Sequence, residues 1–242
     1  MRSQTDRVTS TELTVVRRPA PVSGRSDLDA VKAAFDALDP DAGDGATLLL
    51  GRCAPTAAFT RRDALLPGYH EACAVALERG FEPVLRPVGG HLAAYDEGSL
   101  VVHLWQPLRE AREGIRSRFE RLGTALGEAL SGLGVPDVRL GAVPGEYCDG
   151  EWSLNHAGRH KLVGTGQRIS RNGYLFSAVV VVTGADRLRS LLVPAYDALG
   201  LGLDPETVGE VSASVPGIGV EQVAEAVAEA VAEAVAEALG AG

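Results

Sequence analysis

LRPVGGHLAAYDEGSLVVH, residues 85–103, places a glycine pair between two apolar runs of the chain. The run at 83–88 has the composition of a β-strand, and the run at 99–105 alternates like one. Gly89 and Gly90 carry no side chains, so backbone N–H groups at this point can approach a phosphate or a carboxyl group, with Arg86 as the charge partner. A plain turn is the alternative, and a second element of the sequence has to decide between them.

Outward from this stretch, short strand-like runs alternate with helical patterns, which predicts a mixed α/β or α+β domain. The runs at 161–170 and 174–183 are predicted to form a hairpin, because Asn172-Gly173 is a favoured pair for a tight turn with positive φ. Further strands are predicted at 13–17, 47–51, 56–60 and 137–140, and helices at 26–38, 67–80 and 109–134. The apolar stripe of the third helix predicts that it covers a sheet.

The bulk composition favours one large domain, or a domain with a small appendage, of 242 residues and net charge −9. This acidic balance disfavours nucleic-acid and membrane-surface binding, because both partners attract basic faces. The N-terminus lacks the apolar core of a secretory signal, and no apolar run approaches about 18 residues, so a cytoplasmic location is expected. The three cysteines are widely separated, which predicts neither a disulfide framework nor a metal site.

Residues 220–242 differ in composition from the rest, repeating Ala-Val-Ala-Glu every four residues. Alanine favours a helix, although glutamates at i, i+4 cost about 0.2–0.5 kcal/mol per pair. Docking of this helix on the domain is favoured over coiled-coil assembly or a free tail.

The second informative stretch is GEYCDGEWSLNHAGRHKLVGTGQR, residues 145–168. It places Lys161 beside the small residues of LVGTG, where little bulk separates the ammonium group from a ligand. The sequence contains no GxxxxGK[ST], GxSxG or HExxH motif, and its Gly-x-Gly fragments lack the full dinucleotide-binding spacing.

Taken together, the two stretches resemble the biotin/lipoate A/B protein ligase family. Its members carry R-x-x-G-G-G-x-x-x-H-D and, later, G-R-K-[IVL]-x-G-[ST]-[AG]-[QF] with an essential lysine. Residues 86–96 read RPVGGHLAAYD, so His91 replaces the third glycine and Tyr95 the histidine. Residues 158–167 read GRHKLVGTGQ, with His160 inserted before Lys161. The resemblance spans residues 55–183.

The resemblance implies a class II synthetase-like α+β catalytic domain over residues 1–202, with a central, mostly antiparallel sheet flanked by helices. A small C-terminal helical appendage is then expected at 203–242. The implied reaction attaches lipoate or octanoate to the lysine of a lipoyl carrier domain, either of a 2-oxoacid dehydrogenase or of the glycine-cleavage carrier protein. Lys161 is the implied catalytic residue, and the substrate or adenylate is bound by Arg86, Gly89, Gly90, His91, Asp96 and Gly164.

Two mechanisms are open within the family. A lipoate–protein ligase forms an acyl-adenylate and needs ATP and Mg²⁺, and some members also need an accessory domain on a partner chain. A cysteine-dependent transferase needs no cofactor and forms a thioester, here on Cys148, thirteen residues before Lys161. The ligase is the leading prediction, and a non-catalytic member that binds an acyl group or a carrier is a further alternative.

The residues around Cys148 argue against a thiolate. Glu146, Asp149 and Glu151 are predicted to raise the pKa of the thiol, unless a histidine or Lys161 folds over it. An apolar slot for the acyl chain is expected nearby, with candidate walls at Val88, Leu100 and Val163. The remaining histidines with no carboxylate at a diagnostic spacing are predicted to be structural or surface residues: His70, His103 and His156.

Overall fold

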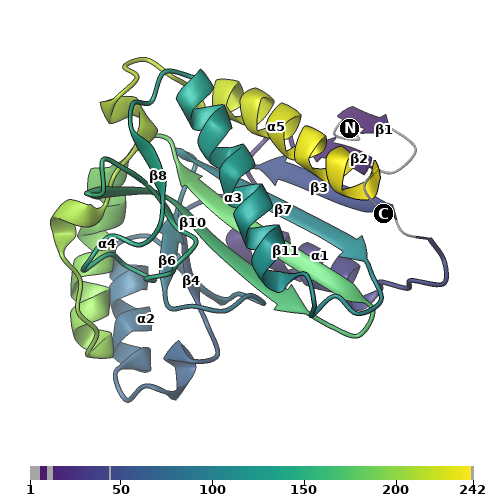
Figure 1. Cartoon of the computed structure of the whole chain (residues 1–242). Coiled ribbons are helices and arrows are strands. Elements are labelled where there is room, and N and C mark those ends of the chain that lie inside the picture. The colour runs from purple at the N-terminus through teal and green to yellow at the C-terminus, as the bar shows by residue number, and fades with distance from the viewer. Residues whose placement is uncertain (1–5, 10–12, 44, 241–242) are drawn as a thin grey trace.

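The computed structural model describes residues 6–9, 13–43 and 45–240 of the chain (Figure 1). Within these ranges an eight-stranded sheet has the order β1-β2-β3-β7-β11-β10-β9-β8, and every neighbouring pair is antiparallel except β2 and β3. The α+β fold with a central, mostly antiparallel sheet is therefore confirmed. Its strands are β1 (Asp6–Thr9), β2 (Leu13–Arg17), β3 (Ala46–Gly51), β7 (Ser99–Pro107), β8 (Val138–Leu140), β9 (Leu154–His156), β10 (His160–Ile169) and β11 (Gly173–Val181).

A second, three-stranded sheet holds the opening stretch of the sequence analysis. It consists of β5 (Glu82–Leu85), β4 (Thr56–Phe59) and β6 (Ala93–Tyr95), with β4 between the other two. The strands that flank the glycine pair, β5 and β6, are therefore not paired with each other. β5 runs parallel to β4 and β6 runs antiparallel to it, so the segment 86–92, which joins β5 to β6, crosses over the end of β4. The next strand, β7, lies in the large sheet.

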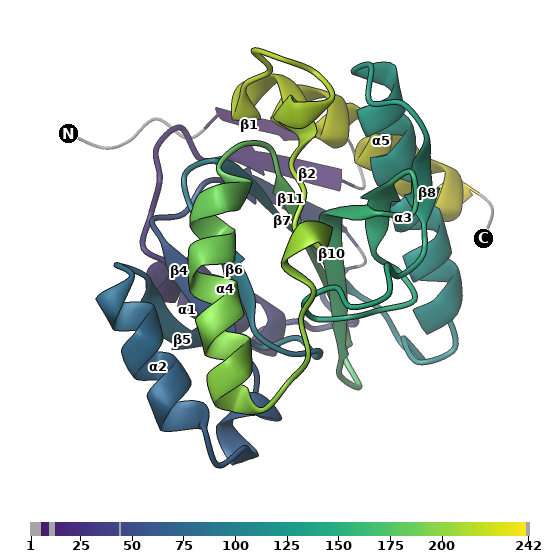
Figure 2. The same cartoon turned by 90° about the vertical axis from the view of Figure 1, so that its left-hand side faces the viewer.

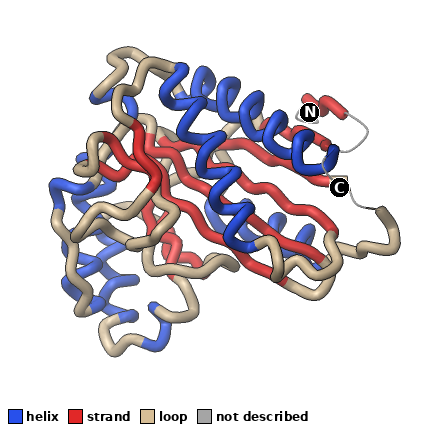
Figure 3. Tube along the Cα trace, in the orientation of Figure 1, coloured by secondary structure: helices blue, strands red, loops and turns tan. Residues whose placement is uncertain are grey.

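Helices cover both sheets (Figures 1, 2 and 3). α3 (Ile115–Gly132) and α5 (Val220–Gly240) pack on one face of the large sheet, and α1 (Gly24–Asp36) packs on the other face, between it and β5. α2 (Tyr69–Glu78) and α4 (Ala185–Leu199) pack together against the small sheet. Single 3₁₀ turns occupy Asp63–Leu65, Pro205–Thr207 and Val211–Ala213. No helix in the described ranges is long and apolar enough to cross a membrane.

The C-terminal repeat docks on the domain, as favoured from its sequence. Val223, Val227, Val231 and Val235 recur every four residues and are at most 2% exposed, because they enter the core shared by α3 and the large sheet. The repeat thus builds an amphipathic helix whose valine seam faces inward.

The hairpin of β10 and β11 is confirmed, but its turn differs from the prediction. Neither Asn172 nor Gly173 has a positive φ, so the expected tight turn does not form. A Cβ on Gly173 would lie 2.2 Å from the backbone oxygen of Gln106 on β7. Close packing of β11 on β7, rather than turn geometry, therefore requires a glycine here.

Candidate functional site

The centre of the site is the thiol of Cys148, in the loop between β8 and β9. The Arg86 guanidinium donates to Sγ from Nη2 at 3.1 Å, and the backbone N–H of His91 donates to it at 3.3 Å. Cys148 is partly buried and has a φ of +44°, a left-handed conformation that is costly for a residue with a side chain. The loop and the segment 86–91 together hold this geometry.

The glycine pair makes the approach of these groups feasible. Gly90 has a φ of +99°, and a Cβ on it would lie 2.6 Å from the thiol sulfur and 2.8 Å from Arg86 Nη2. A Cβ on Gly89 would meet nothing within 4 Å. Gly90 is therefore a point of close approach, and the segment is more than a plain turn.

The electrostatics of the site favour the thiolate. Burial raises the pKa of the Cys148 thiol, but the charges of Arg86 and Lys161 and the hydrogen bonds from Arg86 and the His91 amide outweigh burial, so the pKa falls below its usual value. The thiolate is stabilised as an acceptor of charge-assisted hydrogen bonds.

The expectation that three neighbouring acids would raise this pKa is wrong. The Glu146 carboxylate turns toward Lys161, Glu151 pairs with Arg116 at 2.9 Å, and Asp149 is exposed to solvent. The acids that are close to Cys148 in the sequence therefore do not direct their negative charges at the thiol. Lys161 instead supplies a positive charge, which the sequence analysis had named as a condition for a thiolate.

Lys161 on β10 is 1% exposed, and its ammonium group donates three hydrogen bonds to the loop that carries the thiol. Its Nζ donates to Glu146 Oε1 at 3.0 Å, to the Tyr147 backbone oxygen at 2.8 Å and to the Cys148 backbone oxygen at 2.9 Å. A Cβ on Gly164 would lie 3.4 Å from Lys161 Cε, at ordinary van der Waals distance, so Gly164 lies beside the lysine stem without crowding it. The ammonium group thus fixes the loop and adds positive charge beneath it.

Two side chains that the sequence analysis did not single out, Tyr196 and Asp63, contact the residues around the thiol. The Tyr196 hydroxyl accepts from the Cys148 backbone N–H at 2.6 Å and donates to the Leu92 backbone oxygen at 2.8 Å. The His91 ring lies against Asp63, with Nδ1 and Oδ1 2.6 Å apart. No local spacing could reveal these contacts, because they join residues 28 to 104 positions apart.

Asp96 belongs to a different environment. Its carboxylate accepts from the Gly98 backbone N–H at 2.9 Å and from Arg187 at 3.2 Å, in the turn before β7. Burial raises the pKa of this carboxyl group, against the opposing effect of those two donors. These contacts tie the turn to α4 rather than to Cys148 or Lys161.

A narrow slot beside Arg86 lies between the large sheet and α1. Strand pairing aligns Val101, Val179 and Gly164 in one row across β7, β11 and β10, and the slot opens above it. The slot has a cavity volume of about 30 Å³, so an acyl chain would have to displace side chains such as Val88 and Leu28 to enter it. Of the predicted walls, Val88 lines it, whereas Leu100 and Val163 belong to the core on the opposite face and are not walls.

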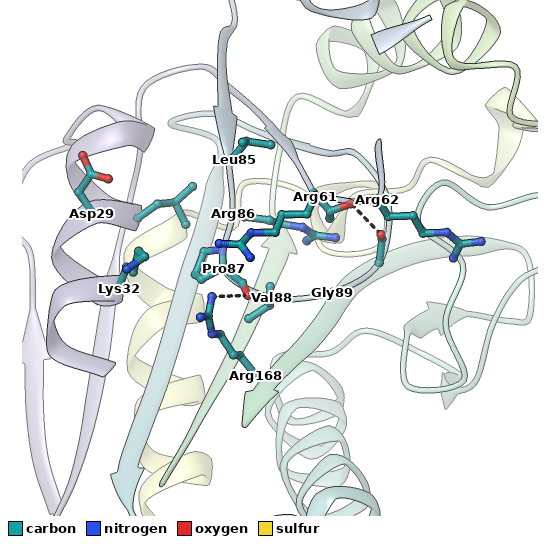
Figure 4. Close-up of a pocket in the computed structure, with 13 residues that line it drawn as sticks. Asp29, Lys32, Arg61, Arg62, Leu85, Arg86, Pro87, Val88, Gly89 and Arg168 are labelled. Carbon is teal, nitrogen blue, oxygen red and sulfur yellow. Dashed lines mark hydrogen bonds between the residues drawn. The ribbon is translucent and has the colours of Figure 1, made fainter. Parts of the chain in front are cut away.

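A wider cavity of about 530 Å³ lies in front of the glycine pair (Figure 4). The chain segment 85–90 forms one wall, and the rim is mainly cationic. Arg168 donates from Nη1 to the Pro87 backbone oxygen at 3.4 Å. The charged residues that line the cavity are Asp29, Lys32, Arg61, Arg62, Arg86 and Arg168. Among the described residues, no group of three or more His, Cys, Asp or Glu side chains is placed to hold a metal ion.

This fold is that of the lipoate protein ligase class of catalytic domains. The chain belongs to the lipoyl protein ligase A/B catalytic domain family, whose family model matches residues 37–232. It is similar to an octanoyl-[GcvH]:protein N-octanoyltransferase of Exiguobacterium sibiricum, with 32% identity over 140 residues, 58% of this chain and 50% of that protein. A protein of the same name from Anoxybacillus flavithermus is 30% identical over 129 residues, 53% of this chain and 46% of that one. The chain thus matches about half the length of these curated relatives.

Solved structures share the fold. A lipoate-protein ligase A bound with ATP superimposes with a TM-score of 0.72 at 18% identity, over 94% of this chain and 86% of that one. A bipartite lipoate protein ligase from Thermoplasma acidophilum, studied with its E2 lipoyl domain, gives a TM-score of 0.69 at 18% identity, over 94% and 84%. At these identities the likeness is one of architecture alone.

Proposed function

We propose that the chain is an acyltransferase that carries an octanoyl or lipoyl group as a thioester on Cys148 and passes it to the lysine of a lipoyl carrier domain. The observation that carries this proposal is the Cys148 sulfur, held by the Arg86 guanidinium and the His91 amide next to the slot. The names of the two relatives support the same reaction class and indicate the glycine-cleavage carrier protein, GcvH, as the donor.

In the first step the thiolate attacks the carbonyl carbon of the acyl group. With an octanoyl-lysine donor, an S–C bond forms and the C–N bond of the amide breaks, and the leaving amine takes a proton from solvent. Gly89 and Gly90 line the adjoining cavity, and their backbone N–H groups are the donors we propose for the carbonyl oxygen as its charge develops.

In the second step the neutral amine of the acceptor lysine attacks the thioester. A new C–N bond forms, the C–S bond breaks, and the amine proton goes to solvent while the Cys148 thiolate is restored. Donor and acceptor exchange one acyl group for one proton, so this route consumes no ATP.

Lys161 acts in this proposal through position and charge. Its donors hold the backbone of Tyr147 and Cys148, and its charge favours the thiolate in both steps. A direct contact of the ammonium with the acyl carbonyl, as the family resemblance implies, would require it to release one of these oxygens.

An ATP-dependent ligase is the second candidate, favoured by the cationic rim of the wide cavity. Arg61, Arg62 and Arg168 around the glycine pair suit the phosphates of a nucleotide, as the donor chemistry of guanidinium groups predicts. Magnesium would be needed only on this route.

The experiment mixes the purified chain with apo carrier domain and either octanoyl-GcvH or octanoate, with and without ATP and Mg²⁺. Intact mass spectrometry follows both proteins. The transferase route predicts an octanoyl adduct on the chain without ATP, lost in Cys148→Ser and retained in the matched Cys73→Ser, followed by a mass gain on the carrier.

Each alternative has its own signature in the same assay. Mass gain on the carrier that requires ATP and survives Cys148→Ser would establish the ligase and contradict the thioester route. No gain from any donor would favour a non-catalytic acyl or carrier binder, or a need for an accessory chain, and addition of that chain would separate these two.

A further inference from the structure

Two hydrogen-bonded polar side chains, His103 and Ser177, line the slot among mainly apolar and small residues. His103 on β7 is 3% exposed, and both of its ring nitrogens have partners: Nδ1 lies 2.8 Å from Ser177 Oγ and Nε2 lies 3.0 Å from Asp27 Oδ2. Asp27 in turn pairs with Arg18. The sequence analysis placed His103 among the structural or surface residues, because its carboxylate partner lies 76 positions away.

The charge on Asp27 decides how the ring is held. Burial raises the pKa of Asp27, but His103 and Arg18 outweigh burial and lower it, so the carboxylate is ionised near neutral pH. In the arrangement that satisfies every partner, His103 Nε2–H donates to Asp27 and Nδ1 accepts from the Ser177 hydroxyl. A ring tied on both sides cannot swing away at low cost.

Strand order places this ring at the far end of the slot. The end next to the thiol is marked by Arg86 and by Gly164 on β10, which packs against Lys161. The slot then crosses β11, where Ser177 keeps accessible surface although it lies in the middle of a central strand, and ends at β7 with His103.

The distance across the slot follows from sheet geometry. β10 and β7 are separated by β11 alone, so the slot spans two strand spacings, about 9–10 Å in all. This matches the length of an extended octanoyl chain, and lipoate has the same eight-carbon backbone. Asp27 on α1 holds the ring from above, and Leu28 beside it forms part of the roof.

We propose that His103, held by Asp27 and Ser177, closes the acyl slot and limits the chain to the length of octanoate or lipoate. The identity of the ligand rests on the proposed function. A longer chain would have to push the ring from its two partners, or press methylene groups against a hydrogen-bonded pair, and either change opposes the gain from burying more apolar surface.

The test is equilibrium binding of free octanoate, decanoate and dodecanoate to the full chain, which requires no chemistry at Cys148. His103→Ala is expected to raise the affinity for dodecanoate relative to octanoate by about tenfold or more, as added methylene groups are buried. The ratio of the two affinities in one sample does not depend on the fraction of folded protein. Trp105→Leu, on the same strand and face but outside the slot, is the matched control and is expected to keep the wild-type ratio.

Two further variants test how the ring is held. Ser177→Ala is expected to shift the ratio in the same direction by a smaller factor, and it carries the test alone if His103→Ala does not fold. Asp27→Asn weakens the hydrogen bond that holds the ring but leaves the ring in the slot. The affinity for decanoate is therefore expected to rise more than the affinity for dodecanoate. Asp27 is a positioning residue, and rescue of the wild-type ratio by Asp27→Glu would confirm that role.

An unchanged chain-length ratio in both His103→Ala and Ser177→Ala would overturn the proposal. The outcome can be told apart from that of the transferase assay. If a thioester forms on Cys148 but the chain-length ratio is unchanged, only the proposal about His103 is contradicted. If the ratio shifts but no thioester forms, the proposal about His103 stands and the proposed reaction is contradicted.

Discussion

The pairing of Arg86 with Cys148 gives a prediction whose size can be worked out. In Arg86→Gln the guanidinium charge 3.1 Å from the sulfur is lost, while an amide of similar reach remains. Two unit charges at that separation interact with roughly 5 kcal/mol at an effective dielectric constant of about 20, and solvent at the partly exposed thiol reduces this value. Opposite charges at such distances typically shift a pKa by about 1–3 units.

The sign follows from the direction of the native shift. The pKa of Cys148 is lowered in the folded chain, so removal of a cation raises it and the thiolate at pH 7 becomes about tenfold scarcer per unit of pKa. Lys161 remains in the variant, so the pKa is expected to rise by about 1–2 units rather than to return fully to the value that burial alone would give.

The assay is the rate of iodoacetamide alkylation against pH, with Cys148 followed by peptide mass mapping. Cys53 is fully buried and burial raises its pKa, as it also does for Cys73, so neither obscures the signal. Arg61→Gln removes a cation from the cavity rim and is the matched control, with no shift expected. An alkylation midpoint in Arg86→Gln equal to that of the wild type would refute the assignment of Arg86 as the partner of the thiolate.

Three further predictions concern the same framework. Gly90→Ala is expected to slow thioester formation by about 100-fold, because a Cβ there displaces the sulfur from its position; Gly80→Ala, at φ +76° with nothing within 4 Å of its Cβ, shares the backbone strain and is expected to keep the rate. Lys161→Met leaves the buried Glu146 carboxylate without its cation and is expected to cost about 3–5 kcal/mol in urea unfolding, and a loss below 1 kcal/mol would contradict the pairing. Asp27→Asn is expected to lower stability at pH 7 by about 1–3 kcal/mol. Because the pKa of Asp27 is lower in the folded chain, that deficit should shrink as the pH falls below about 4, and a deficit independent of pH would show that the carboxylate is not ionised.

Local sequence patterns predicted the strands and helices whose residues alternate or repeat clearly. The strands at 13–17 and 99–105 and the helix at 220–242 have clear periodicity and appear near the expected residues. Three residues show little alternation, and β6 and β9 were missed, whereas the equally short β8 was predicted at 137–140. Apart from the β10–β11 hairpin, strand pairing could not be predicted: β4 inserts between β5 and β6, and nothing in the glycine segment signals that crossing.

The site divides in the same way. The resemblance singled out Arg86, Gly90 and Lys161, and the structure gathers them around Cys148. The charge argument failed because it counted neighbours along the chain, whereas the loop turns Glu146 inward. The His103 chain could not be inferred, since its members come from three elements with no fixed spacing between them.

The valine seam of α5 has a consequence for the order of events during synthesis. The seam covers β2, β3 and β7, strands made within the first 107 residues, and residues 223–235 that cover them are made last among the elements of this core. Until the ribosome has released those residues, the part of this face formed by β2, β3 and β7 lies open to solvent, so contacts of the longest sequence separation close the domain. We expect a nascent chain stalled before residue 220 to hold an incomplete core that protease cleaves readily, and one that has cleared residue 235 to resist it.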